Sequence, residues 1–186
     1  MDTNLKTGIW QQFGASIDYL ADTVSACPDQ FWLASLWQTP NTKPEFSQFW
    51  YVVYHTLFWL DLYLTGAEEG FVPPAPFTLI EQDDDGPLPE RVYTKDELQG
   101  YLHDGRQKCR ATIEALTDET AQRRCRFGWG EASFVELLLF GVWTKTTTQT
   151  ERVARSAREW LLLCRQTHRD HSDDHRSTSR LSPASV

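Results

Sequence analysis

The sequence contains no uncharged apolar run of about 18 residues, the length that a membrane-spanning helix needs. Its opening residues, MDTNLKTGIW, lack the basic-then-apolar order of a secretory signal. Basic residues are outnumbered by acidic ones, 18 against 26, and the formal net charge is −8. Because nucleic acids bind to basic protein surfaces, we expect no nucleic-acid partner. The missing apolar run leads us to expect no membrane association.

Cysteine is scarce, and the sequence has no close cysteine pair. The four cysteines are Cys27, Cys109, Cys125 and Cys164. This scatter is typical of reduced thiols in a cytoplasmic protein, and it argues against disulfides or a cysteine-based zinc site. We expect Cys109 and Cys125 to fill the core. A Ser-His-Asp order, a glycine-rich phosphate loop and a Glu-x-x-His motif are also missing.

Aromatic residues, in contrast, are abundant, with 8 Trp, 10 Phe and 6 Tyr. They concentrate in residues 46–64, FSQFWYVVYHTLFWLDLYL. Apolar residues recur there every three or four positions, which predicts a helix, and rings also occupy the opposite side. A helix that is apolar nearly all round is buried inside a bundle or partly in a subunit interface. His55 lies in its middle and is the leading candidate functional residue.

Three further helices are predicted from apolar spacing and capping signals. The first covers residues 4–26, and a short helical turn follows within residues 29–39. The third runs from the capping box at Thr94 and Glu97 to Leu116, and the fourth opens with a second capping box at Ser133 and Glu136. Residues 117–131 are expected to form a loop.

Residues 67–91 separate the second and third helices and contain five prolines: Pro73, Pro74, Pro76, Pro87 and Pro89. A connection of this length is too long for a turn between neighbouring helices. We therefore predict an all-α fold, a four-helix bundle with a long proline-rich crossover between helices two and three. The acidic run Asp83 to Asp85 is expected to be a solvated part of that crossover.

The apolar stripe of the fourth helix stops after Gly141. Its next inward positions are Thr144 and Thr148, in a segment rich in β-branched residues that form helices poorly. Apolar spacing resumes at Val153, but residues 167–186 are polar and predicted to be disordered. The bundle domain is therefore assigned to residues 1–166, and histidines in the tail would bind metal only adventitiously.

Four motifs resemble the DinB-like (DinB/YfiT) superfamily over residues 5–141. They are F-x-x-F-W-x-x-x-Y-H-T-L around His55, FVPPAPF at 71–77, YTKDEL at 93–98 and WGEASF at 129–134. The resemblance implies a divalent metal, zinc or nickel, held by one histidine on helix two and a His-x-x-x-His pair on helix four. His55 matches the first position, whereas Thr144 and Thr148 match the pair. Threonine hydroxyls are poorer ligands than imidazoles for these metals, so a degenerate site is expected.

Several explanations of this departure remain open. The chain has kept the family fold and lost its metal, or His55 joins Asp61 or His103 in another site, or the reading frame shifts after about residue 142. Alternatively, His55 is a buried histidine bonded to a neighbouring Tyr or Trp.

Three functions follow from these readings. The first is a DinB-like protein with a degenerate divalent-metal site between helices two and four, whose activity the sequence leaves open. The second is a metal-dependent transferase of low-molecular-weight thiols, since some family members activate a thiol with their metal. The third is a non-catalytic homodimer that binds a small apolar ligand.

Overall fold

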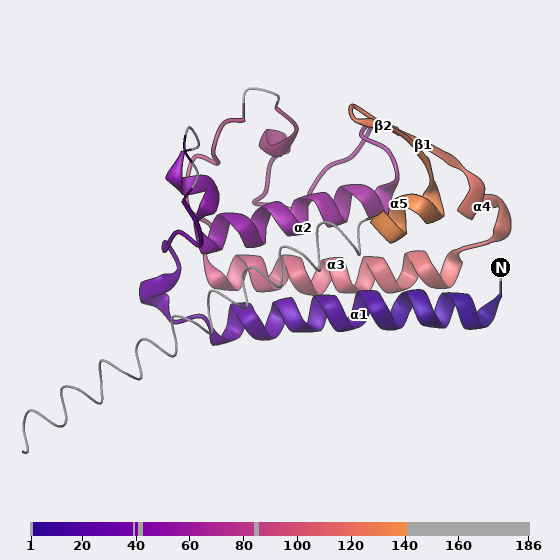
Figure 1. Cartoon of the computed structure of the whole chain (residues 1–186), viewed down its shortest axis with the longest axis horizontal. Helices are drawn as coiled ribbons and strands as arrows, with labels where there is room; N and C mark the ends of the chain where they lie inside the picture. The colour runs from indigo at the N-terminus through magenta and orange to yellow at the C-terminus, as the bar shows by residue number, and fades with distance from the viewer. Residues whose placement is uncertain (1, 39, 41–42, 84–85, 141–186) are drawn as a thin grey trace, which may run out of the picture.

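The computed structural model describes residues 2–38, 40, 43–83 and 86–140. This part of the chain is mainly helical, as predicted. Its three long helices are α1 (Thr3–Ala26), α2 (Phe49–Thr65) and α3 (Lys95–Ala115). They lie side by side, with α3 between the other two in the view of Figure 1. None of the described helices is both long enough and apolar enough to cross a bilayer.

Helix α1 runs antiparallel to α3. Lys6, near the start of α1, donates to the backbone carbonyl of Glu114 at the end of α3 over 3.0 Å. At the other end, Gln99 of α3 donates to Ser25 of α1 over 3.0 Å. The stripe of α1 that faces the core is the predicted one: Ile9, Phe13, Ile17, Leu20 and Val24 are all buried.

Helix α2 runs in the same direction as α3. Tyr101 and Lys108, two turns apart on α3, bond to Asp61 and Thr65, one turn apart on α2. Two parallel helices need a connection that returns along their whole length. Residues 66–94 form this α2–α3 connection, which includes the short 3₁₀ helix η3 (Leu79–Gln82).

The α2–α3 connection docks on the helices through aromatic rings. Phe71 is buried edge-on against Phe58 of α2, with ring centroids 5.4 Å apart. Phe77 stacks on Tyr101 of α3 at 4.4 Å. The connection ends at the predicted capping box, in which Thr94 and Glu97 bond to each other's backbone N–H groups.

The predicted start of the central helix at residue 46 is wrong. Residues Pro44–Ser47 form the 3₁₀ helix η2, and α2 begins at Phe49. Backbone hydrogen bonds from Leu36 to Ser47 and from Phe49 to Ala34 hold Gln48 extended and prevent an earlier start. A short helical turn is predicted within residues 29–39. The structure has the 3₁₀ helix η1 (Asp29–Phe31) there, and the same pairing holds the residues after it.

The prediction of a loop over residues 117–131 is also wrong. This segment contains a short helix, α4 (Asp118–Gln122), and an antiparallel hairpin of β1 (Arg124–Phe127) and β2 (Gly130–Ser133). Cys125 and Phe127 are buried and alternate with exposed arginines, the two-residue period of a strand. Glu131 pairs with both of these arginines, Arg124 and Arg126, over 2.7 and 2.9 Å.

Helix α5 (Phe134–Phe140) follows directly after β2. Its start carries the predicted capping signal, since the Glu136 carboxylate accepts from the Ser133 backbone over 2.7 Å. The predicted continuation of this helix, with Thr144 and Thr148, and the predicted tail lie outside the described residues.

Gly66 ends α2 in the left-handed region, with φ at 77°. A Cβ there would contact the Arg123 side chain and lie 3.0 Å from the ring of Phe134. We therefore expect Gly66→Ala to lower the free energy of unfolding by about 1–2 kcal/mol, measured by urea denaturation. Gly100→Ala is the control, because this exposed helical glycine has no atom within 4 Å and alanine should raise stability there. A Gly66→Ala variant as stable as the wild type would contradict this account of the helix end.

Candidate functional site

Helix α2 is buried on nearly every side. Only His55, Trp59 and the terminal Thr65 are partly exposed among its residues. His55 and Trp59 lie one turn apart, so they share a stripe of the helix surface. The predicted site residue therefore lies on the partly exposed stripe of α2, with 25% of the His55 side chain exposed.

The partner of His55 is Glu81, contributed by η3 of the α2–α3 connection. The imidazole Nδ1 lies 2.7 Å from Oε2 of Glu81, whose side chain is only 4% exposed. Tyr54 supports this position by donating to the backbone carbonyl of Thr78, the residue before η3, over 3.4 Å. The prediction that His55 bonds to a Tyr or Trp is therefore wrong, since its hydrogen-bond partner is a buried carboxylate.

Glu81 has one oxygen bonded and one not. Its second oxygen, Oε1, is buried and has no hydrogen-bond partner within the described part of the chain. Removing a carboxylate from water is costly unless partners replace the lost hydration. The bond to His55 thus offsets part of this cost, and it ties the connection to α2.

Aromatic rings flank the imidazole along α2. The ring of Tyr51 stacks on His55 with centroids 6.1 Å apart, and Trp59 lies at 6.2 Å on the other side. Burial and the nearby Glu81 carboxylate raise the pKa of the Tyr51 phenol above its usual range, so it stays protonated at neutral pH. The imidazole is therefore confined in orientation by rings on both sides.

The contact with Glu81 selects one tautomer of neutral His55. An ionised carboxylate only accepts hydrogen bonds, so opposite ionised Glu81 it is Nδ1 that donates. Nε2 then keeps its lone pair. Such an imidazole can accept a hydrogen bond from a ligand at Nε2.

The three-histidine metal centre implied by the family resemblance does not fit the donors found here. Of its three positions only His55 is described, because Thr144 and Thr148 lie beyond residue 140. Over residues 2–38, 40, 43–83 and 86–140, no group of three or more His, Cys, Asp and Glu side chains can hold a metal ion. Glu81 already occupies Nδ1, so a ligand at this histidine can use only Nε2.

Neither of the two alternative partners predicted for His55 joins it. His103 is exposed on α3 and bonds to Gln107 over 2.6 Å. The Asp61 carboxylate instead accepts hydrogen bonds from Lys108 and Tyr101 of α3, over 2.5 and 3.0 Å. His55 and Asp61 therefore belong to separate clusters on α2.

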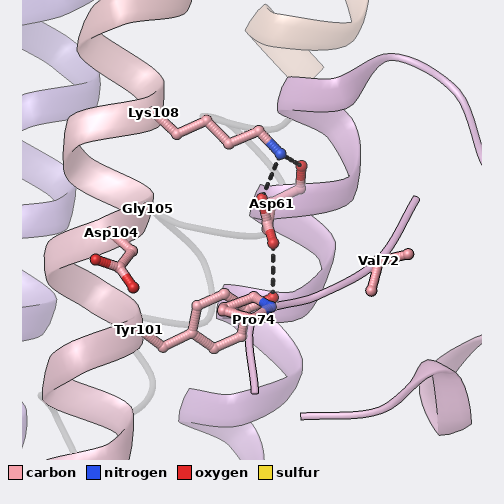
Figure 2. Close-up of a pocket in the computed structure, with 7 residues that line it drawn as sticks. All are labelled: Asp61, Val72, Pro74, Tyr101, Asp104, Gly105 and Lys108. Carbon is pink, nitrogen blue, oxygen red and sulfur yellow. Dashed lines mark hydrogen bonds and ion pairs between the residues drawn. The ribbon is translucent and has the colours of Figure 1, made fainter. Parts of the chain in front are cut away.

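The Asp61 cluster lines a second feature, a cavity of about 290 Å³ between α2, α3 and the α2–α3 connection. In Figure 2, the Asp61 carboxylate lies between the Lys108 ammonium and the Tyr101 hydroxyl. Val72 and Pro74 of the connection and Asp104 and Gly105 of α3 complete the lining.

Gly105 leaves space in this cavity, and it lowers the stability of α3. It lies in the interior of α3, where glycine is about 1 kcal/mol less favourable than alanine. A Cβ at this position would meet only Leu60, at an ordinary contact distance of 3.9 Å. Packing therefore does not require glycine here, and the missing side chain adds room to the cavity.

Sequence reasoning missed Glu81 and Lys108. Glu81 is next to an acidic run, so it resembled another solvated loop residue. The available signal was Ile80, the apolar residue next to Glu81, which packs against the core. Lys108 gave no signal, because its pairing with Asp61 depends on the relative position of two helices.

The fold and this site define a mainly helical domain with a histidine on a buried central helix. A model of the DinB superfamily matches residues 12–144, more than half of the 186-residue chain, and the chain therefore belongs to the DinB superfamily. The resemblance inferred from the motifs is confirmed. Neither a curated protein nor a solved structure matches the chain.

The His55–Glu81 bond predicts the tautomer of the neutral imidazole. We expect the ¹⁵N shifts of His55 at high pH to show hydrogen on Nδ1. Glu81→Gln should preserve this tautomer because the amide oxygen still accepts, whereas Glu81→Ala should move the hydrogen to Nε2. Long-range ¹H–¹⁵N correlation spectra measure this, with His55→Asn used to assign the signal. Hydrogen on Nε2 in the wild type would rule out the bond.

Proposed function

We propose that this protein binds a low-molecular-weight thiol at the exposed edge of His55 and activates it by proton transfer to Nε2. The observation that carries the proposal is the 2.7 Å bond between Nδ1 of His55 and the buried carboxylate of Glu81. A histidine held in this way is the base half of a catalytic dyad. The thiol is chosen because the family resemblance implies thiol chemistry.

The proposed reaction needs no metal to generate the nucleophile. The S–H proton passes to Nε2 of His55, and the resulting thiolate attacks an electrophilic carbon and displaces its leaving group. Glu81 stabilises the imidazolium, which can return the proton to the leaving group. The metal of the family would serve the same purpose, lowering the pKa of the thiol.

The thiol must come from a small molecule rather than from the described cysteines. Cys27, Cys109 and Cys125 are buried and free. Burial raises the pKa of the Cys27 thiol to about 11 and that of Cys109 to about 12, so both stay protonated and unreactive at neutral pH. Free thiols also support a reducing compartment such as the cytoplasm.

We place this site in a four-helix bundle whose fourth helix begins with α5. Phe134, Leu137 and Leu138 of α5 are buried at helical spacing, which supports an inward face that continues beyond the described residues. In the sequence, a step of three residues from Gly141 and then one of four reach Thr144 and Thr148, which match the family's ligand positions. On this proposal the metal site is degenerate, with threonine at two of its three positions.

The test is thiol transfer by full-length protein from glutathione or cysteine to a chromogenic aryl halide. His55→Asn is the informative variant, because the Asn amide can still donate to Glu81 while the proton-accepting nitrogen is lost. We expect this variant to lose about 100-fold or more in kcat/KM. Glu81→Gln should lose less, since it keeps the tautomer and removes only the charge.

Chelation separates this proposal from a metal-dependent transferase. Activity should survive EDTA, and any zinc or nickel retained should disappear when His168, His171 and His175 of the tail are replaced by alanine. Activity that EDTA abolishes and added zinc restores would support the metal-dependent transferase instead. Equal activity of His55→Asn and the wild type would reject both.

A non-catalytic homodimer is the second candidate, favoured by an exposed apolar cluster. Trp129 is 49% exposed and stacks on Phe140 of α5 with centroids 5.4 Å apart, and Leu139 is also exposed. Such clusters often mark interfaces or binding sites for apolar ligands. Sedimentation of the full chain, with Trp129→Ser as the variant, distinguishes a dimer formed through this surface from a monomer.

A further inference from the structure

The cavity beside Asp61 lies away from His55. Six residues separate the two along α2, so their side chains leave the helix about 120° apart. The cavity belongs to the face shared with α3 and is covered by Val72 and Pro74 of the connection. Its volume, about 290 Å³, is near the lower end for small-molecule sites.

The side-chain hydrogen-bond donors of this cavity are already used. Lys108 carries three N–H groups and has three acceptors: the Asp61 carboxylate, the Asp61 backbone carbonyl and the Thr65 hydroxyl, over 2.5, 3.0 and 2.7 Å. The Tyr101 hydroxyl donates to Asp61 over 3.0 Å. An anionic ligand would therefore find no free donor among these side chains.

Acceptor capacity, in contrast, remains. Each carboxylate oxygen of Asp61 offers two lone pairs and receives one side-chain donor. Its side chain is 92% buried, since only 8% is exposed, so water satisfies this capacity poorly. Burial and Asp61 raise the pKa of the Tyr101 phenol, so it stays protonated and donates to Asp61. Its oxygen can still accept a hydrogen bond.

The charge of the lining also favours a cation. Lys108 and Asp61 neutralise each other at the back of the cavity. Asp104, at its edge, forms no hydrogen bond or ion pair with any described residue and supplies one uncompensated negative charge. Tyr101, Asp104, Gly105 and Lys108 share one face of α3, so this charge and the buried acceptors border the same space.

From this balance of donors and acceptors we propose that the cavity binds a small organic cation, a primary ammonium group on a compact apolar body. The ammonium donates hydrogen bonds to Asp61 and Tyr101, and the negative charge of Asp104 attracts it. The apolar body occupies the room left by Gly105 and packs against Val72 and Pro74. This site is independent of the chemistry proposed at His55.

The test compares three probes of similar shape and different charge: benzylammonium, benzyl alcohol and benzoate. Titration of ¹⁵N-labelled full-length protein should show saturable shifts of α3 amides with benzylammonium, weaker shifts with benzyl alcohol and none with benzoate. Asp104→Asn should weaken benzylammonium binding about fivefold and leave benzyl alcohol unchanged, because it removes only an exposed charge.

Gly105→Leu should abolish binding by filling the cavity, while Gly100→Leu, on an exposed part of the same helix, should not. If circular dichroism shows that Gly105→Leu does not fold, Gly105→Ala replaces it, since its Cβ meets only Leu60 at 3.9 Å. That variant should weaken benzylammonium binding at least twofold. Equal binding of benzoate and benzylammonium, unchanged affinity in the folded Gly105 variant, or no ammonium binding at all would overturn the proposal.

Discussion

The structure depends on how a nearly all-apolar helix accommodates its few polar side chains. Helix α2 is buried on almost every side, and the carboxylates of Asp61 and of Glu81, which bonds to His55, are nearly inaccessible to water. His55 and Asp61 each receive partners from another element: Glu81 of the α2–α3 connection for His55, and Lys108 and Tyr101 of α3 for Asp61. These polar contacts also fix where the connection and α3 lie against α2, because breaking either would leave a buried carboxylate unpaired.

The topology explains why both clusters exist. Since α2 and α3 are parallel, the chain must return along their length before α3 begins, and in the view of Figure 1 the α2–α3 connection makes this return beside α2. Its rings, Phe71 and Phe77, anchor it on α2 and α3. Pro74, between these two rings, lines the cavity. Glu81, which follows Phe77, bonds to His55. A short turn could join only antiparallel helices, and it would supply neither group.

Local signals predicted the helices well. The stripe of α1, the capping box at Thr94 and the burial of α2 follow from spacing within one segment, and all are present. Sequence missed what depends on tertiary contacts. The hairpin after α4 is stabilised by Glu131 pairing across strands too short to show a clear period. His55 could be chosen as a site residue because it is one imidazole on an apolar helix, but its partner Glu81 lies 26 positions away in a proline-rich stretch.

We propose that the Glu81–His55 pair also accounts for the departure from the metal ligands that the family resemblance implies. A carboxylate on Nδ1 fixes the tautomer and the orientation of the ring, which directs Nε2 at a metal when other ligands are present. When they are absent, the same contact directs the Nε2 lone pair at a substrate proton. Threonine at positions 144 and 148 would then change the way a substrate is activated without any change in α2 or in η3. The site proposed here needs no new scaffold, because its essential contact joins two segments that the helical fold already brings together.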